Sequence, residues 1–278
     1  EDDEYVESVK AVFRKYGLVI KALCAHVPSQ CVGDYNDPRL DNFAPAGLAG
    51  KPEEIRQWAI GTMKATAVAA RKLGAYCVTG FVGSPIWKYF YSFPQTTEEM
   101  IEKGYQEIYD LWSPILDVFK ENGIKYCLEV HPGEIASTAH LLEKFADRPE
   151  FGLNFDPSHL QWQGVVPHVF LKDFIDRVYH VHIKDCAVTL DGRNGLLGSH
   201  IEFGDLRRGW NFRSPGHGDV NFEEIIRVLN AHGYDGPLSV EWEDSGMDRE
   251  FGAREACEFV RRIDFPVSSI KFDDAIKN

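Results

Sequence analysis

Apolar residues alternate along the chain between short continuous runs and longer amphipathic stretches. The short runs are typical of buried strands and cover residues 18–26, 75–81, 125–131, 151–156, 178–184 and 237–242. The amphipathic stretches predict helices at residues 3–16, from Pro52 to before Gly74, from a capping box at Thr96 to before Gly123, and at 138–146, 222–232 and 249–262. This alternation predicts a parallel sheet covered by helices, either a closed barrel or an open doubly wound sheet.

Ionisable residues at the carboxyl ends of the predicted strands decide between these two architectures. They are Glu129 and His131, Asp156, His182, and Glu241. In a barrel these strand ends converge on one mouth, whereas an open sheet would spread them along an edge. The chain also has no G-x-G-x-x-G or Walker loop, which a nucleotide-binding open sheet would need. The sequence therefore predicts an α/β fold of the (β/α)₈ TIM barrel type.

The organisation of the chain predicts a single barrel domain over residues 1–278, because no linker, low-complexity run or clear repeat divides it. Residues 186–218 form a connection that is long for a barrel, which predicts a cover over the active site or a subunit contact. A barrel begins with a strand, yet the first predicted helix already starts near residue 3. We therefore expect the full protein to carry a further strand before residue 1, since a gap would leave backbone groups unpaired.

Charge and cysteine usage narrow the class of partner. The formal net charge of -13 opposes binding to nucleic acids or anionic membranes, and no basic face of any size offsets it. The six cysteines form no C-x-x-C pair, and several lie in apolar runs, as reduced thiols of a cytoplasmic protein do. No apolar stretch has membrane-spanning length. We expect a cytoplasmic protein that acts on small molecules.

The converging ionisable residues predict a metal site. Glu129, Asp156, His182 and Glu241 supply three carboxylates and one imidazole. This donor set suits Mn²⁺ best, with Mg²⁺ or Co²⁺ as alternatives, while a structural zinc would favour thiolates. A cation also explains how carboxylates this close together stay ionised, because bare like charges would raise one another's pKa.

Five motifs carry a family resemblance. They read LEVHPGE at 128–134, NFDPSH at 154–159, HVHIKD at 180–185, RSPGHGD at 213–219 and GPLSVE at 236–241. In this order they resemble the xylose isomerase-like sugar isomerase/epimerase superfamily over roughly residues 18–262.

The resemblance implies that the metal is held by Glu129, Asp156, His182 and Glu241, and that His159 and Arg213 face the sugar. Lys184 and His26 are further candidate substrate-binding residues.

Such a site predicts removal of a proton next to a carbonyl through an enediolate. The family resemblance implies that Glu129 and Glu241 act as acid and base on opposite faces of the sugar, which epimerises or isomerises it. In the alternative, His131 is the base and a β-substituent leaves, which is a lyase reaction.

The lyase alternative has a resemblance of its own. Residues 198–200 and 204–210, with EVHP and VEWEDSGMD, are similar to the catalytic subunit of C-glycoside deglycosidases, which cleave 3-oxo-glycosides by elimination. That resemblance implies a hetero-oligomer with a smaller subunit; otherwise we expect a homo-oligomer.

A nuclease of the endonuclease IV type is a remote alternative. It needs three zinc ions and further histidines at early strand ends. His26 could supply one, but Thr79-Gly80-Phe81 supplies none.

Several of these residues also have ordinary structural interpretations. Asp156 precedes a proline and could simply cap the next turn. Arg213 could pair with Asp219 without touching a substrate. The aromatic segment 87–93 is of a kind that usually packs, although its place after a strand end also suits stacking on a sugar.

Overall fold

The computed structural model describes residues 2–89, 93–134, 138–270 and 272–276, and its chain divides into two units. Unit 1 comprises residues 1–154 with 177–180, and unit 2 comprises residues 155–176 with 181–278. Two strands pass from one unit into the other, since β4 (Phe151–Phe155) and β5 (Val178–Ile183) cross these limits. The single domain expected from the sequence stays a prediction.

Unit 1 is built on parallel strands in the order β1 (Ala22–Cys24), β2 (Cys77–Gly80), β3 (Lys125–Glu129), β4 and the start of β5. Each coincides with a run predicted as a strand, and the observed strands are shorter. In the β3–β4 pair, Glu129 stands opposite Asn154. The strand pairing thus brings the end of β3 beside the end of β4.

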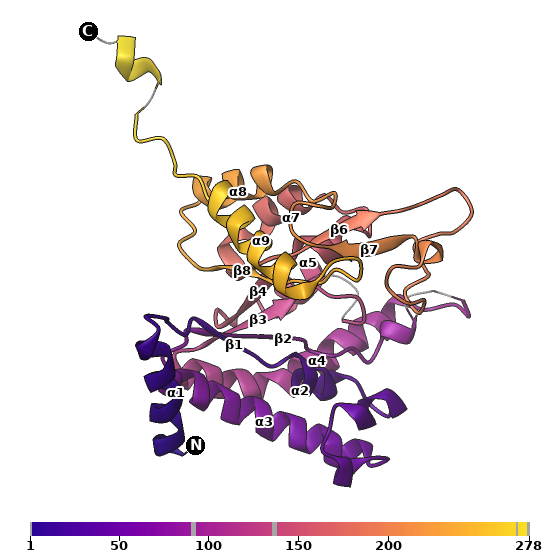
Figure 1. The fold of residues 1–278 in the computed structure, drawn as a ribbon. Coiled ribbons are helices and arrows are strands. Elements are labelled where there is room, and N and C mark those ends of the chain that lie inside the picture. Colours follow the sequence, from indigo (N-terminus) through magenta and orange to yellow (C-terminus); the bar gives the residue numbers. More distant parts are fainter. Residues whose placement is uncertain (1, 90–92, 135–137, 271, 277–278) are drawn as a thin grey trace. The chain divides into compact units, whose positions relative to one another are not determined.

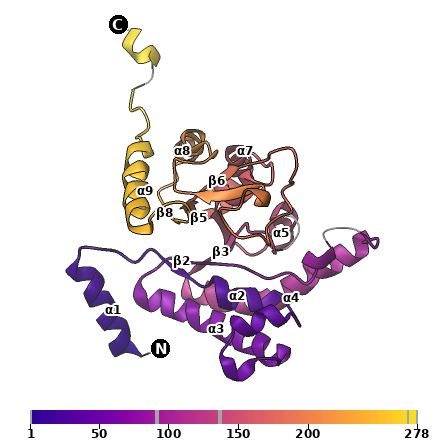
Figure 2. The same ribbon diagram turned by 45° about the vertical axis from the view of Figure 1, so that its right-hand side comes forward.

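The helices of unit 1 are α1 (Asp3–Lys15), α2 (His26–Gly33), α3 (Pro52–Leu73), α4 (Glu98–Asn122) and α5 (Thr138–Lys144), with 3₁₀ turns at Pro38–Asn42, Ala46–Leu48 and Trp87–Tyr89. Helices α2, α3 and α4 lie on one side of β1 and β2 (Figures 1 and 2). The cap of α4 is Thr97, one residue after the predicted Thr96, and its side chain accepts a hydrogen bond from the Met100 N–H. The sequence did not predict α2, because the apolar run from residue 18 continues to His26.

Amphipathic spacing explains why these helices pack. In α3 the buried residues include Ile55, Ala59, Met63 and Ala67, which recur every four residues on one face. Burial of that face stabilises the helix more than propensity does. Among the described residues, no helix is both long and apolar enough to cross a membrane.

Unit 2 contains the second half of β5, which pairs in parallel with β8 (Leu238–Val240). Its helices are α6 (Pro157–Gln161), α7 (Pro167–Phe174), α8 (Phe222–Ala231) and α9 (Arg249–Ile263), with 3₁₀ turns at Leu206–Arg208 and Phe272–Ile276, and a further turn at Ile175–Arg177 spans the unit limits. Figures 1 and 2 show the segment after α9 leading away from the helices of this unit.

The connection at residues 186–218 is more regular than the sequence predicted. It contains an antiparallel pair, β6 (Asp185–Val188) with β7 (Trp210–Arg213), which forms a separate sheet. The pair has its own apolar core, in which the Trp162 and Trp210 rings stack with centroids 4.5 Å apart. Short strands with mixed polar residues lack the continuous apolar run by which the others were found. Its role as a cover or a subunit contact, and the oligomers expected above, stay predictions.

Glu134, the last residue of the LEVHPGE motif, ties the segment after β3 to the segment after β2. Its Oε2 accepts hydrogen bonds from the Val82 N–H at 2.7 Å and the Gly83 N–H at 2.8 Å. Burial raises the pKa of Glu134 from an ordinary 4.5 to about 8, although the two backbone N–H groups oppose this. The folded protein therefore holds the Glu134 proton at pH values where the unfolded chain has released it.

Replacing Glu134 with Gln should remove a pH dependence of stability. Between pH 4.5 and about 8 the unfolded wild type ionises Glu134 while the folded wild type keeps it protonated, so wild-type stability falls as pH rises. As the pH rises through this window, the free energy of unfolding of Glu134→Gln should increase relative to that of wild type, by at most about 5 kcal/mol. Urea unfolding at several pH values measures this, with exposed Glu121→Gln as control. Parallel curves for wild type and Glu134→Gln would contradict the assignment.

Candidate functional site

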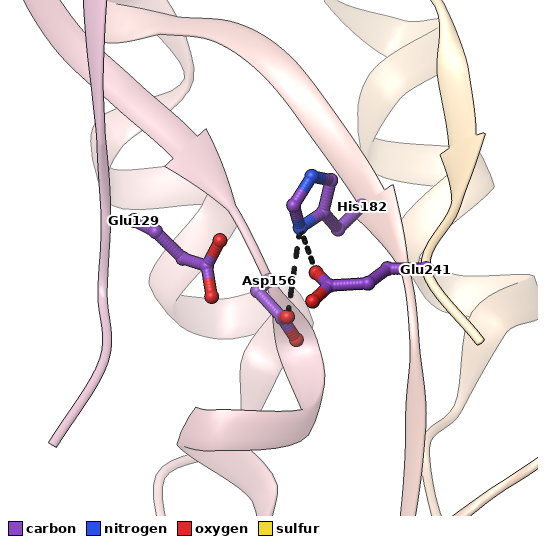
Figure 3. A group of neighbouring side chains, drawn as sticks. All are labelled: Glu129, Asp156, His182 and Glu241. Atoms are coloured by element: carbon purple, nitrogen blue, oxygen red, sulfur yellow. Dashed lines mark ion pairs between the residues drawn. The ribbon is translucent and has the colours of Figure 1, made fainter. Parts of the chain in front are cut away.

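Three predicted metal ligands meet in unit 2. Asp156 directly follows β4, His182 lies in β5, and Glu241 follows β8. Because β5 and β8 are parallel and His182 stands opposite Ser239, their carboxyl ends lie at the same edge. Each of the three offers one ligand atom, and these atoms lie within 4.8 Å of one another (Figure 3).

His182 is the centre of this group. Its Nδ1 lies 3.7 Å from Asp156 Oδ2 and also pairs with Glu241 Oε2, as the dashed lines in Figure 3 mark. Asp156 uses its other oxygen, Oδ1, as the cap of α6, accepting from the Ser158 N–H at 2.8 Å and hydroxyl at 2.6 Å. Capping and metal binding are thus compatible for Asp156, because each uses a different oxygen.

The donor set of the group fits a divalent cation. Asp156 is fully buried and His182 is 8% exposed, so their polar atoms are largely withdrawn from water. Two carboxylates and an imidazole converging in such a place match the ligands that hard to borderline divalent ions take. Ligand atoms around one such ion, bound at about 2.1 Å, lie up to about 4.2 Å apart, which is close to the observed span.

Lys184 supports Glu241. Its side chain is buried, and its Nζ donates to Glu241 Oε1 and to Glu243 Oε1, both at 3.0 Å. The ammonium group also lies 4.3 Å from the centre of the Phe212 ring. The sequence predicted Lys184 as a substrate-binding residue and did not single out Glu243 or Phe212. In the structure Lys184 therefore contacts Glu241 Oε1, while the other oxygen of Glu241, Oε2, pairs with His182.

Glu129, also labelled in Figure 3, has a set of partners within unit 1. Its Oε2 lies 2.8 Å from His26 Nε2 and accepts from Asn154 Nδ2 at 3.1 Å. Asn154 Oδ1 lies in turn 2.7 Å from His180 Nδ1. Glu129 is only 2% exposed, so these contacts set the direction of its carboxylate. His26, predicted as a substrate-binding residue, is thus a direct partner of a predicted metal ligand.

The protonation of His26 reflects this contact. Burial lowers the pKa of His26, but hydrogen bonds with Cys24 and Glu129 raise it by more than burial lowers it, to about 9. His26 Nδ1 lies 2.8 Å from Cys24 Sγ, and this hydrogen bond lowers the pKa of the thiol. At neutral pH the His26 imidazolium therefore offsets the negative charge of Glu129.

The remaining predicted histidines have different surroundings. The backbone turns immediately after β3, where the His131 N–H donates to Glu129 O at 2.9 Å, so the alternation that predicted a shared face ends before His131. His131 Nδ1 donates to Pro132 O. His159 is buried in α6, with Nε2 3.6 Å from Asp156 Oδ2.

Arg213 lies at the end of β7 and is 30% exposed. Its Nη1 lies 3.7 Å from Asp244 Oδ1, whereas Asp219, the structural partner considered from the sequence, accepts from the Val188 N–H at 2.7 Å. Asp244 also accepts from the Ser214 N–H at 3.0 Å. The same carboxylate therefore holds both the arginine and the turn that follows it.

Asp185 organises the turn after Arg213, a role that the sequence did not predict. Asp185 is fully buried and accepts four backbone hydrogen bonds, from Cys186, Gly216, Gly218 and Val220. Burial raises the pKa of Asp185, and the N–H donors oppose this. A buried aspartate after a strand and a later G-x-G turn are signals that could have predicted this pairing.

Comparisons with known proteins identify the fold family. The family described as "Xylose isomerase-like TIM barrel" matches residues 1–263. This confirms the predicted fold class and the superfamily resemblance.

Curated relatives match over part of their length. An inosose dehydratase from Clostridium perfringens (strain 13) is 35% identical over 133 residues, which are 45% of this chain and 42% of that protein. The uncharacterized protein YfiH of Bacillus subtilis (strain 168) is 28% identical over 187 residues, 64% of this chain and 60% of that protein. The chain thus spans less than two thirds of either relative.

Solved structures resemble the chain over most of its length. The apo form of 3-keto-D-glucoside 4-epimerase, YcjR, from E. coli has a TM-score of 0.67 at 18% identity, covering 94% of this chain and 85% of that one. The IOLI protein with a bound zinc atom has a TM-score of 0.63 at 18% identity, covering 95% and 83%. At these identities the likeness shows the fold alone.

Gly218→Ala tests the turn around Asp185. An added Cβ would lie 2.3 Å from Asp185 Oδ1 and 2.5 Å from Cys186 O, so the carboxylate and the turn would have to move apart. We expect the free energy of unfolding to fall by about 1–3 kcal/mol. Chemical denaturation measures this, with Gly195→Ala as the matched control, because a Cβ there meets nothing within 4 Å. Equal stability of the two variants would show that the turn does not depend on this close approach.

Proposed function

The chain belongs to the xylose isomerase-like TIM barrel family, and we propose that it is a divalent-metal-dependent enzyme that removes a proton next to a sugar carbonyl. The observation that carries this proposal is the group of Asp156, His182 and Glu241 at the carboxyl ends of parallel strands. Barrel enzymes keep their active sites at that end. We propose that the enzyme is a sugar isomerase or epimerase.

We propose Glu129 as the fourth metal ligand. The β3–β4 register sets it opposite Asn154, which precedes Asp156 by two residues. Residues two apart along a strand point to the same face, so the Glu129 and Asp156 side chains belong to one face of the sheet. We propose Mn²⁺ as the ion, because three carboxylates with one imidazole form an oxygen-rich set.

The bound ion would polarise the sugar carbonyl as a Lewis acid and so acidify the neighbouring C–H group. Glu129 would remove that proton, since His26 and Asn154 both hold its Oε2 and fix the carboxylate. Glu241, held by Lys184 and protonated at the start of the cycle, would give a proton to the substrate, and exchange with solvent would then restore both carboxyl groups. Return to the opposite face of the same carbon epimerises the sugar, and return to the adjacent carbon isomerises it.

The substrate-facing residues follow from what each side chain touches. We propose that His159, beside Asp156, and Arg213, at the end of β7, bind sugar hydroxyls. A guanidinium offers several donors in one plane, which suits vicinal hydroxyl oxygens. Lys184 would act mainly through Glu241, because two carboxylates already take its Nζ donors.

A lyase is the second candidate. Relatives named inosose dehydratase, at 33% and 35% identity over less than half of the chain, favour it. The same proton abstraction would then be followed by loss of a β-substituent, either water or, on 3-oxo-glycosides, the aglycone. His131 is the base proposed for this alternative, because it follows Glu129 by two residues and the hydrogen bond from its Nδ1 to Pro132 O orients the ring.

Asp156→Asn should release the metal. The amide keeps the size of the side chain but removes the charge, so we expect metal affinity to fall more than about tenfold. Elemental analysis after dialysis should find about one ion per chain in wild type and in the control Asp173→Asn, an exposed residue of α7, and much less in Asp156→Asn. Equal metal content in all three would remove the assignment. If zinc binds in preference to manganese when both are offered to wild type, zinc replaces Mn²⁺ as the proposed ion.

The base can be identified by proton exchange in D₂O. We expect metal-loaded wild type to exchange the proton next to the carbonyl of ketoses, inososes or 3-oxo-glucosides, and His131→Ala to retain both the exchange and the metal. NMR would follow exchange and product together. A loss of about 10²–10⁴-fold in His131→Ala with the metal retained would instead make His131 the base and favour elimination.

A further inference from the structure

A pocket lined by none of the metal-group residues lies within unit 1. It has a volume of about 460 Å³ and is bordered by residues 34–39 after α2, residues 84–89 after β2, and the first half of α4. Small-molecule sites usually span roughly 300–1,000 Å³, so one sugar-sized ring fits this space. None of the residues predicted as catalytic or metal-binding lines it, nor do His26, His159, Lys184 or Arg213; the aromatic segment considered for sugar stacking does contribute Trp87 and Tyr89.

Aromatic rings form part of the pocket wall. Tyr35, Trp87 and Tyr89 line it, and Trp87 and Tyr35 are 37% and 48% exposed. The Arg56 guanidinium lies 4.3 Å from the centre of the Tyr35 ring, which holds that ring in place. Exposed aromatic faces in a pocket suit the apolar C–H face of a sugar ring. The described part of the aromatic segment 87–93 therefore lines a cavity; residues 90–92 lie outside the described residues.

The charges of the lining are balanced. The acidic residues are Asp34, Asp37 and Glu107, and the basic residues are Arg39, Lys88 and Lys103. A balanced wall gives an anion such as a sugar phosphate no net attraction. It does offer both acceptors and donors, which is what a ring of neutral hydroxyl groups requires.

The walls of the pocket are held in place without a ligand. Asp34 accepts from the Ser84 N–H at 2.7 Å and from Gln30 Nε2 at 2.8 Å, which joins two of the bordering segments. Ile86 lies so close to α4 that a Cβ on Gly104 would be 2.2 Å from its Cγ2. A preformed site avoids the entropy cost of ordering loops on binding.

We propose that this pocket binds a neutral carbohydrate ring at a site separate from the proposed metal centre. Helix α2 runs from His26, the partner of Glu129, to the border of the pocket at Asp34. Eight residues of helix span about 12 Å, and none of the residues of the metal group lines the pocket. The proposal therefore stands independently of the function proposed above.

Ligand-observed NMR titration of the full chain tests this proposal. The probes are methyl α-glucopyranoside and myo-inositol, with glucose 6-phosphate as the anionic comparison. We expect saturable binding of at least one neutral probe that weakens roughly tenfold or more in Trp87→Ala, because the stacking face is lost. Trp87→Phe should restore most of the affinity. Tyr5→Ala, which removes an exposed aromatic ring on α1, should bind as wild type does.

The metal-site variant separates the two sites. Asp156→Asn should bind the neutral probe as wild type does, because neither Asp156 nor any other residue of the metal group lines the pocket. Loss of binding in Asp156→Asn would assign the ligand to the metal centre and overturn the proposal. It would also be overturned by the absence of saturable neutral binding, by unchanged binding in both Trp87→Ala and Tyr35→Ala, or by much tighter binding of the phosphate.

Discussion

Compensation of buried negative charge at strand ends is the constraint on which the rest of the site depends. Carboxylates withdrawn from water cost several kcal/mol each unless charged or hydrogen-bonding partners compensate them. Buried Glu129 has His26 and Asn154 on one oxygen, and Glu241, whose side chain is 34% exposed, has Lys184 on one oxygen and His182 on the other. Each carboxylate is thus oriented by protein groups. A divalent cation would offset the remaining negative charge of these carboxylates. Because the side chains are already oriented, they would need less rearrangement to bind it than mobile side chains would.

Residues outside the candidate site determine where its side chains can stand. Asp185 collects four backbone N–H groups and so shapes the turn that follows Arg213. Glu134 does the same for the segments after β2 and β3. Both carboxylates lie in motifs that resemble those of sugar isomerases, yet their contacts are with backbone. A motif residue can therefore serve by building the loop that carries a functional side chain.

The two proposed sites differ in the chemistry that they suit. The metal group is rich in carboxylates and lies at strand ends, where the carbon next to a polarised carbonyl could be deprotonated. The pocket beside α4 has balanced charge and aromatic walls, which suit recognition without reaction. Both would select polyhydroxylated ligands, although for different reasons. Metal binding selects oxygen pairs, whereas the pocket selects the shape and the apolar face of a ring.

The sequence by itself determined the order of the main strands and helices, and the family match confirms the barrel class. Hydrophobic periodicity depends only on residues that are near one another in the sequence, so it can be read without knowing the tertiary contacts. Only the tertiary structure decided that β1 ends before His26, that Lys184 turns to Glu241 and Glu243, and that His131 lies beyond its strand. These outcomes depend on partners far away in the chain, because a buried charged side chain points to whichever opposite group the fold brings within hydrogen-bonding distance.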